Sequence, residues 1–276
     1  MFRLAISGNL RIFAGMIPKI LHLCWLSGDA YPAKIAKCID SWRRVMPDYE
    51  IVLWDTRRFD LSQSAWVREA FEKRKYAFAA DYIRFYALYT MGGIYLDSDV
   101  EVLRPFDDLL ALPYFIGAEK AGTPEAAVMG AERGCDWVKQ CLDYYDGRHF
   151  VKADGTLDIR KLPEIMEEQI RRLKPLRTLT LEESRQRLNT DYDPRRRADE
   201  FASEVLVLSD AYFSPKVFDS REVELTPYTY AIHHYQNSWF SPKAKAYYRT
   251  RTLLIRLLGY ETVCKAERML MPWRFR

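Results

Sequence analysis

Two aspartates separated by one residue, Asp97 and Asp99, directly follow a short apolar stretch, Ile94–Leu96. Carboxylates at the end of a strand can approach one hard cation such as Mg²⁺ or Mn²⁺, which also takes water and phosphate oxygens as ligands. A cation held there would neutralise the charge that develops on a departing diphosphate. An isolated Asp-x-Asp triplet is more often a solvated turn, so the surrounding sequence must decide between the two interpretations.

A second polar pair, Asp81 and Arg84, lies within Tyr76–Met91, where apolar residues occupy nearly every helical position and predict a buried helix. Residues three apart share one face of a helix. A structural ion pair is one interpretation of this spacing. Because burying such a pair has a desolvation cost, a polar ligand that bridges both groups is the alternative. Arginine can reach a phosphate or a hydroxyl, and aspartate accepts hydrogen bonds from sugar hydroxyls.

Strands and helices alternate along the chain before and after these pairs. The first half predicts a strand at Ile17–Trp25, a helix at Ala33–Val45, a strand at Tyr49–Trp54, a helix near Ser64–Lys75, the buried helix ended by Gly92 and Gly93, a strand at Ile94–Leu96 and an extended stretch at Val100–Leu103. Further strands are predicted at Tyr114–Ala118, Ala127–Gly130, Glu204–Leu208 and Tyr230–His234. This order is typical of an α/β fold with a parallel sheet flanked by helices.

The composition narrows the class of protein. The chain has 276 residues, of which 49% are hydrophobic and 29% charged, as expected for a globular domain with one large core. Nine Lys and Arg against two Asp and Glu follow Ser241, so the rest of the chain is slightly acidic. Nucleic acid is therefore not expected as a partner, because its binding proteins usually carry basic residues across the fold. Five cysteines without a C-x-x-C pair argue against a zinc ribbon and indicate reduced thiols and a cytoplasmic location.

The segment Tyr82–Glu101, preceded by Asp81, reads YIRFYALYTMGGIYLDSDVE and contains D-x-x-R followed by G-G-x-Y-x-D-x-D. This pattern resembles the DXD-type sugar transferases of the Och1-like and capsular-polysaccharide family, glycosyltransferase family 32. It is also similar to the catalytic core of the clostridial glucosylating toxins. The opening segment Ile17–Ile20 with His22 and Trp25, and the closing segment His233–Trp239, look like the same family's first strand and last loop.

The resemblance implies a GT-A fold, with a Rossmann-like mixed sheet flanked by helices, and assigns roles to several residues. Trp25 would stack on the base of the donor, although a place in the core is the alternative. Asp81 and Arg84 would contact the donor sugar, and Tyr95 would line the donor pocket. By the same resemblance, Asp99 is the expected direct metal ligand, and Asp97 lies closer to the ribose and the metal-bound water.

The closing segment is expected to cover the donor and to complete the metal site. The resemblance implies that this segment supplies a side-chain metal ligand and a tryptophan, Trp239, that reaches the β-phosphate. Ser238, ahead of Asn237, is the other expected contact to the metal-bound donor. A histidine can ligate Mn²⁺ or donate to phosphate oxygens. The expected metal set is Asp97, Asp99, Ser238 and His234. Whether His233 or His234 faces the site is left open, because neighbours on a strand point to opposite faces.

One segment departs from the family pattern. Many relatives carry Asn-Asn or Asn-Ala where the acceptor-side strand meets the sugar, and here Thr123–Ala127 occupies that zone. Glu125 or Glu119 is the candidate to substitute for the missing amide.

These features predict a retaining, metal-dependent glycosyltransferase. It would move a hexose or N-acetylhexosamine from a nucleotide sugar, expected to be UDP-linked, to a glycan acceptor in surface or capsular polysaccharide synthesis, with Mn²⁺ or Mg²⁺ as cofactor. A toxin-like or effector-like enzyme that glycosylates a protein is one alternative. A nucleotidyltransferase or phosphohydrolase is another, because Glu101, Asp107 and Asp108 could hold a second metal. A saccharide-binding protein with a decayed site is a third alternative.

The expected domain organisation has three parts. Residues 1–16 are an extension outside the core, 17–240 form the GT-A domain with a helical insertion or lid at 149–204, and 241–276 form a basic amphipathic helical tail. The tail either packs on the domain or lies on an anionic membrane, where basic charge adds to apolar insertion. The membrane alternative suits a lipid-linked saccharide acceptor at the inner face of the cell membrane.

Overall fold

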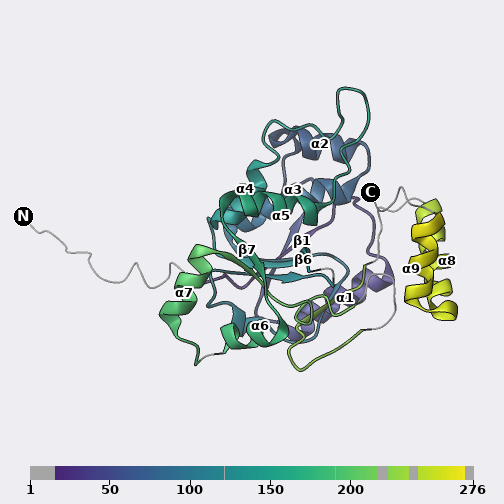
Figure 1. Ribbon diagram of the computed structural model, residues 1–276. Coiled ribbons are helices and arrows are strands. Elements are labelled where there is room, and N and C mark those ends of the chain that lie inside the picture. Colours follow the sequence, from purple (N-terminus) through teal and green to yellow (C-terminus); the bar gives the residue numbers. More distant parts are fainter. Residues whose placement is uncertain (1–15, 121, 190, 217–222, 236–241, 271–276) are drawn as a thin grey trace, which may run out of the picture.

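The computed structural model describes residues 16–120, 122–189, 191–216, 223–235 and 242–270. A five-stranded sheet in the order β2-β1-β3-β6-β5 forms the centre of the molecule (Figure 1). Its strands are β1 (Ile20–Cys24), β2 (Glu50–Trp54), β3 (Gly93–Leu96), β5 (Tyr114–Ala118) and β6 (Pro124–Ala131). Strands β2, β1 and β3 are parallel, whereas β6 runs antiparallel to both β3 and β5. The expected mixed sheet flanked by helices is therefore confirmed, and its second half is antiparallel.

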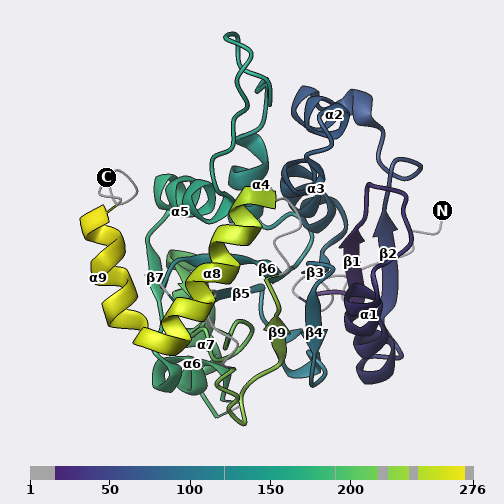
Figure 2. The same ribbon diagram turned by 90° about the vertical axis from the view of Figure 1, so that its right-hand side faces the viewer.

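Helices cover both faces of this sheet, as Figures 1 and 2 show from two directions. On one side lie α2 (Ala65–Glu72), α3 (Tyr76–Met91), α4 (Asp136–Asp143) and α5 (Leu162–Leu173), and α1 (Ala33–Val45) lies on the other. Helix α3 is buried on most of its circumference because it lies between the sheet and its neighbouring helices. An apolar residue at nearly every position is what such a central helix requires.

The connection from α3 to β3 is a tight turn held by a buried histidine. Gly92 and Gly93 have φ angles of +68° and +105°, a conformation that other residues rarely adopt. The Nε2 atom of His22 on β1 lies 2.7 Å from the carbonyl oxygen of Gly92, and its Nδ1 accepts from the indole of Trp54 at 3.1 Å. Burial lowers the pKa of His22 to about 4, so the imidazole is neutral and donates from Nε2 to Gly92. The turn thereby fixes where β3 begins.

Two short ribbons extend the central sheet. Strand β4 (Val100–Val102) pairs antiparallel with β9 (Ala231–His233), and β7 (Leu176–Thr178) pairs parallel with β8 (Val205–Val207). Leu208, just after β8, exchanges backbone hydrogen bonds of 2.8 Å with Ile116 and Ala118 of β5. The β4–β9 ribbon matters most for the site, because it brings the chain near residue 233 beside the turn that follows β3.

Residues 149–204, expected to be an insertion or a lid, contain α5, β7, α6 (Leu181–Leu188) and α7 (Pro194–Ser203). Apolar side chains of this segment, including Leu162, Met166, Ile170 and Phe201, belong to the same buried cluster as the sheet. The segment is thus packed into the core of the domain. Two short 3₁₀ helices, Leu61–Gln63 and Asp107–Leu109, complete the regular structure of the domain.

Two helices follow the domain, α8 (Pro242–Leu258) and α9 (Tyr260–Leu270), and they pack against each other (Figure 2). The carboxylate of Glu267 on α9 accepts hydrogen bonds from Arg251, at 2.8 Å, and from the hydroxyl of Tyr247 on α8. Leu253, Leu254, Leu257, Leu258 and Met269 are exposed on this hairpin. Among the described residues, no helix is long and apolar enough to cross a membrane.

Candidate active site

The acidic pair lies in a turn between β3 and β4. The amide of Asp97 donates to the carbonyl of Ala127 on β6, and Val100 closes the turn by donating to the carbonyl of Asp97 at 3.0 Å. The turn brings both carboxylates together, although residues two apart on a regular strand would be held further from each other by the extended backbone. One carboxylate oxygen from each and a ring nitrogen of His233 all lie within 4.8 Å of one another. This juxtaposition is the centre of the site.

Arg84 on α3 joins this centre to the second polar pair. Its guanidinium lies 3.0 Å from Asp81 and 3.3 Å from Asp97, and it also donates to the carbonyl of Ala126 at 2.8 Å. The ring of Tyr95 lies beneath the guanidinium at 4.6 Å, and its hydroxyl donates to Asp97 at 2.9 Å. Asp81, Arg84, Tyr95 and Asp97 therefore form one connected polar network at the carboxyl end of β3.

Burial controls the protonation of this network. Burial raises the pKa of Asp81 to about 7, although the positive charge of Arg84 acts to lower it. Burial also raises the pKa of Asp97, to which the negative charge of Asp99 adds. Burial acts to lower the pKa of Arg84, but Asp97, Tyr95 and Asp81 together raise it, so the guanidinium keeps its charge.

His233, and not His234, faces the acidic pair. Its Nε2 lies 3.4 Å from Asp99, and its Nδ1 lies 3.1 Å from the carboxylate of Glu125 at the start of β6. Burial acts to lower the pKa of His233, but Glu125 and Asp99 raise it well above the ordinary value. The ring of Tyr235 covers the imidazole, with centroids 4.0 Å apart.

His234 points to the other side of β9. Its Nε2 lies 2.8 Å from Glu101, and its amide donates to the carbonyl of Asp99 at 3.1 Å. His234 therefore contacts the turn that holds Asp97 and Asp99 through its backbone amide, and not through its imidazole. The alternation of side chains along a strand, which left the choice between the two histidines open, explains why only one of them reaches the site. In the residues that the structure describes, the imidazole available to a metal is that of His233.

The donor set fits a divalent transition-metal cation. Two carboxylate oxygens and one imidazole nitrogen converge. Carboxylates are ligands for Mg²⁺ and Mn²⁺, and imidazole is a common ligand for transition-metal cations. The remaining coordination positions would be left for water and phosphate oxygens, as is usual for cations that act on diphosphates. The expected metal ligands Asp97 and Asp99 lie in this set, and His233 takes the place expected of His234.

Trp25 lies at the same edge of the sheet. It follows β1, which runs parallel to β3, so the carboxyl ends of both strands meet there. Its indole N–H donates to the carbonyl of Asp29 at 2.8 Å, and its ring meets the edge of Tyr31 at 5.0 Å. The side chain is partly exposed and held in one orientation, which a stacking platform for a base requires. Asn237, Ser238 and Trp239 of the closing segment lie outside the described residues.

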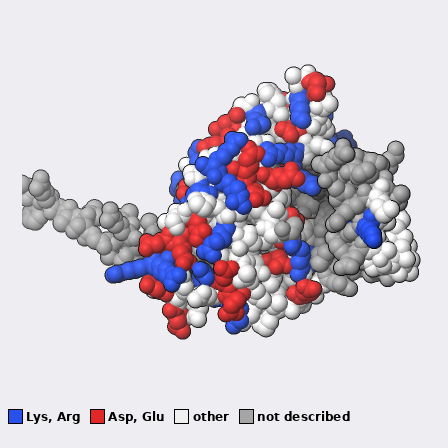
Figure 3. Space-filling model, in the orientation of Figure 1, with Lys and Arg blue, Asp and Glu red and all other residues white. Residues whose placement is uncertain are grey.

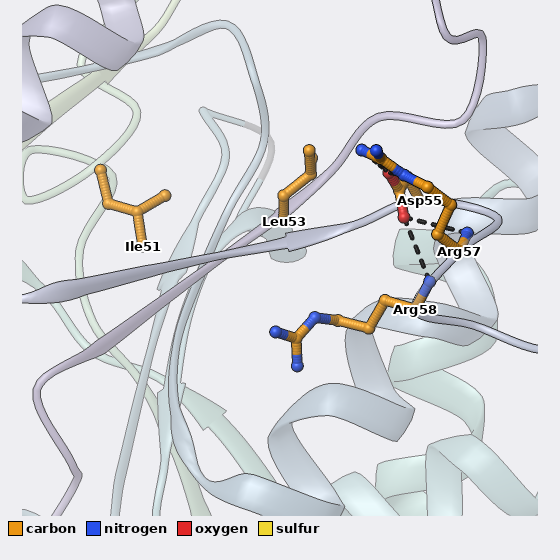
Figure 4. A pocket seen from close by; sticks show the side chains of 5 residues that line it. All are labelled: Ile51, Leu53, Asp55, Arg57 and Arg58. Carbon is orange, nitrogen blue, oxygen red and sulfur yellow. Dashed lines mark hydrogen bonds and ion pairs between the residues drawn. The ribbon is translucent and has the colours of Figure 1, made fainter.

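A separate surface hollow lies on β2, the edge strand of the sheet (Figure 4). Ile51 and Leu53 line it together with a loop in which Asp55 pairs with Arg57 at 2.7 Å. None of Asp97, Asp99 and His233 lines this hollow. We therefore place the candidate active site at the turn after β3, where these three side chains converge.

Several residues of the site could not be found from sequence. Glu125 was expected to substitute for a sugar-binding amide, whereas its carboxylate lies against His233. Ser214, whose hydroxyl donates to Glu125, carries no local signal, because it reaches the site from a loop distant in sequence from the predicted residues. Tyr235 lies within the closing segment His233–Trp239, but its contact with the imidazole of His233 was not predicted.

The fold and this geometry together are those expected of a sugar-nucleotide-dependent transferase. The family model described as "Glycosyltransferase sugar-binding region containing DXD motif" matches residues 32–116, which include Asp81, Arg84, Asp97 and Asp99. The chain therefore contains a segment that is similar to the sugar-binding region of the DXD glycosyltransferases, and the resemblance seen in its sequence is confirmed. His233 and Glu125 lie outside the matched region.

Curated relatives cover a similar part of the chain. Inositol phosphoceramide mannosyltransferase 3 of Schizosaccharomyces pombe is 34% identical over 46% of this chain and 36% of its own length. Mannosyl phosphorylinositol ceramide synthase SUR1 of Saccharomyces cerevisiae is 34% identical over 37% of this chain and 27% of its own. The chain thus spans about a third of the length of these relatives. Among solved structures, PaToxG Glycosyltransferase matches 58% of this chain and 70% of its own, with 18% identity and a TM-score of 0.44.

Proposed function

We propose that this chain is a metal-dependent glycosyltransferase that transfers a hexose or N-acetylhexosamine from a nucleotide sugar, with a UDP-linked donor expected, to a hydroxyl of an acceptor. The convergence of Asp97, Asp99 and His233 within 4.8 Å, beside the Asp81–Arg84 pair, supports this proposal most directly. A bound Mn²⁺ or Mg²⁺ would supply electrostatic stabilisation of the departing diphosphate.

The residues of the chain would bind and orient the donor around that site. Trp25 offers its ring face to the base, and Arg84 offers a charged, fixed guanidinium to the sugar or phosphate. Asp81 accepts from a sugar hydroxyl, and its raised pKa also lets it donate a proton near neutral pH. Retention of anomeric configuration, and the roles of Asn237, Ser238 and Trp239, rest on the family resemblance alone. With the leaving diphosphate able to accept the acceptor's proton, no protein base is required.

A two-metal nucleotidyltransferase is less well supported. It would need further carboxylates beside the acidic pair. Asp107 instead pairs with Lys19, and Asp108 pairs with Arg104 and accepts from the hydroxyl of Tyr230 at 2.6 Å. Glu101 faces His234 on the outer side of the ribbon. The three carboxylates considered for a second metal are thus engaged elsewhere.

For the acceptor, we propose a hydroxyl of a lipid-linked saccharide or polyol at the cytoplasmic face of a membrane. The names of the two yeast relatives refer to inositol phosphoceramide and phosphorylinositol ceramide, and neither name mentions a capsular polysaccharide. The exposed leucines of the α8–α9 hairpin and the basic charge after Ser241 would favour contact with an anionic membrane surface. On the face shown in Figure 3, acidic and basic side chains of the described residues are interspersed, and a nucleic-acid partner is not part of the proposal.

The decisive experiment is hydrolysis of a panel of UDP- and GDP-linked sugars, mannose included, with and without Mn²⁺. We expect Mn²⁺-dependent hydrolysis of at least one donor and a loss of about 10²-fold or more in Asp99→Asn, as for removal of one electrostatic contact in other active sites. Asp107→Asn is the matched control, because it neutralises a nearby carboxylate that faces Lys19. Equal activity of Asp99→Asn and wild type, or no turnover of any donor, would refute the proposal.

A further inference from the structure

Glu125, near the start of β6, has a carboxylate side chain that is almost completely buried. The β5–β6 pairing shifts register between Ile116 and Gly117, so that Gly117 lies opposite Glu125. An irregular register of this kind changes the direction in which the neighbouring side chains point. The carboxylate of Glu125 lies against β9, with Oε1 3.1 Å from Nδ1 of His233.

Groups from three segments surround this carboxylate. Ser214, which is fully buried, donates its hydroxyl to Oε2, and the amide of Ala127 donates to Oε1 at 3.2 Å. The third is Nδ1 of His233, at 3.1 Å from Oε1.

The two ring nitrogens of His233 therefore face two carboxylates. Nε2 faces Asp99 at 3.4 Å, and Nδ1 faces Glu125. Nδ1 is buried and, within the described chain, has no partner with the alignment of a hydrogen bond. Oε1 of Glu125 lies 3.1 Å from it, within hydrogen-bonding distance. In metal sites, a carboxylate at the second nitrogen fixes the tautomer and the orientation of a ligating imidazole.

We propose that Glu125 is a positioning residue, which holds the imidazole of His233 with Nε2 toward the acidic pair and so sets the metal affinity of the site without touching the ion. Ser214 supports it by fixing the second carboxylate oxygen. This inference rests on the proposed function, since it concerns the same metal site. It differs from the role expected of Glu125 as a sugar contact, because the effect on the metal would be present with no donor bound.

The test is the binding of Mn²⁺ alone, measured by isothermal titration calorimetry on the full chain. Glu125→Gln and Glu125→Ala should weaken binding by about 10- to 100-fold, the usual loss when such a partner is removed. Glu69→Gln is the matched control, because Glu69 also holds a histidine, His149, at 2.6 Å, but does so on α2 away from the site. Its Mn²⁺ affinity should stay within about twofold of wild type.

A second measurement separates orientation from general destabilisation. With diamagnetic Zn²⁺ bound, ¹⁵N spectra of wild type should show one His233 tautomer, protonated at Nδ1, whereas Glu125→Gln should show exchange broadening or a mixture. If Glu125→Gln does not fold, the Mn²⁺ affinity of Ser214→Ala is the deciding measurement. This variant removes only one hydrogen bond to the Glu125 carboxylate. A folded Ser214→Ala with unchanged Mn²⁺ affinity would then overturn the inference.

The outcomes distinguish this inference from the proposed function. If wild type does not bind Mn²⁺, both fail. If wild type and Glu125→Gln bind equally, while His233→Ala is weakened, the metal site stands and the role of Glu125 is wrong. If Glu125→Gln loses affinity for a nucleotide sugar but not for Mn²⁺, Glu125 is a donor contact instead.

Discussion

At the scale of single residues, the buried guanidinium of Arg84 balances two aspartates that would otherwise lie uncompensated in the core. It contacts both Asp81 and Asp97, and all three side chains are largely removed from solvent. Charges in such a position are stable only as a set, because removing one partner leaves the others desolvated and unpaired. The network therefore links the stability of the fold to the chemistry of the site.

Arg84→Met should consequently destabilise the protein by about 3–5 kcal/mol, the usual loss when one partner of a buried ion pair is removed. Urea unfolding followed by circular dichroism measures the change. Arg43→Met is the control, because Arg43 forms an exposed pair with Asp40 on α1 and should change stability by less than about 1 kcal/mol. Similar losses in both variants would contradict a special role for the buried guanidinium.

A pH dependence follows from the raised pKa of Asp81. Because the folded state holds this proton more tightly than the unfolded chain, the associated stability is complete below about pH 4. It is lost as pH rises through the folded pKa of about 7. In Asp81→Asn this contribution is absent, so the stability difference between variant and wild type should change by roughly 3–4 kcal/mol between pH 4 and pH 7. Parallel stability profiles of the two proteins would show that Asp81 does not titrate in this range.

The sequence predicted part of the site but not all of it. The spacing of Asp81 and Arg84, and the acidic pair after an apolar strand, were sufficient to expect these residues together. The choice of His233 over His234 required the pairing of β9 with β4, in which Val100 lies opposite His233. The contact between Glu125 and His233 depends on an irregular register between β5 and β6, which no local pattern records.

At the scale of elements, the turn between α3 and β3 is the most constrained connection near the site. A Cβ on Gly93 would lie 2.7 Å from the carbonyl oxygen of Ile20 and 3.1 Å from Nε2 of His22. Both neighbours belong to β1, whose pairing with β3 leaves them little room to move. Only glycine satisfies the positive φ and the close approach together.

Gly93→Ala should therefore lower stability by more than the roughly 1–3 kcal/mol expected from backbone strain alone. Gly134→Ala is the control that measures the cost of backbone strain without a steric clash. Gly134 also has a positive φ, of +81°, but nothing lies within 4 Å of the added Cβ. Thermal unfolding of both variants provides the comparison. Gly93→Ala should also weaken Mn²⁺ binding, since β3 delivers Asp97, and Gly134→Ala should not. Equal destabilisation in the two variants would show that the close approach to β1 costs nothing.

Long, strongly patterned elements were predicted well. Ala33–Val45 and Tyr76–Met91 were expected as helices with the bounds that the structure has, and Tyr114–Ala118 was expected as the strand β5. The antiparallel direction of β6 was missed, because alternation along a strand does not reveal the direction of its partner. Strand β7 was also missed, because its three residues, Leu176–Thr178, are extended only through pairing with β8.

At the scale of the whole molecule, the α8–α9 hairpin presents apolar side chains on a segment with a strong basic excess. Leu253 and Leu257, one helical turn apart on α8, are 55% and 69% exposed. Leu254, Leu258 and Val263 line an apolar hollow between the two helices. Exposed apolar groups gathered in this way mark an interaction surface.

Leu253→Glu/Leu257→Glu should therefore reduce co-sedimentation with phosphatidylserine-containing liposomes. Each leucine contributes roughly 1.5–3 kcal/mol when fully buried, so the double variant should bind at least about tenfold more weakly. Donor hydrolysis should remain unchanged, because these residues lie outside the site. Ile159→Glu is the control, since Ile159 is 64% exposed on a different part of the surface. Failure of the wild-type protein to sediment, or equal sedimentation of the double variant, would rule out membrane contact through this hairpin.

The β4–β9 ribbon has a consequence for how the protein is made. A growing chain that has left the ribosome as far as β6 already contains Asp97, Asp99 and Glu125, but His233 has still to be translated. Until β9 joins β4, three carboxylates face one another without the imidazole between them. If the proposed metal site is correct, it can be completed only at the last stage of domain synthesis, and a nascent chain stalled before β9 would lack the imidazole of His233.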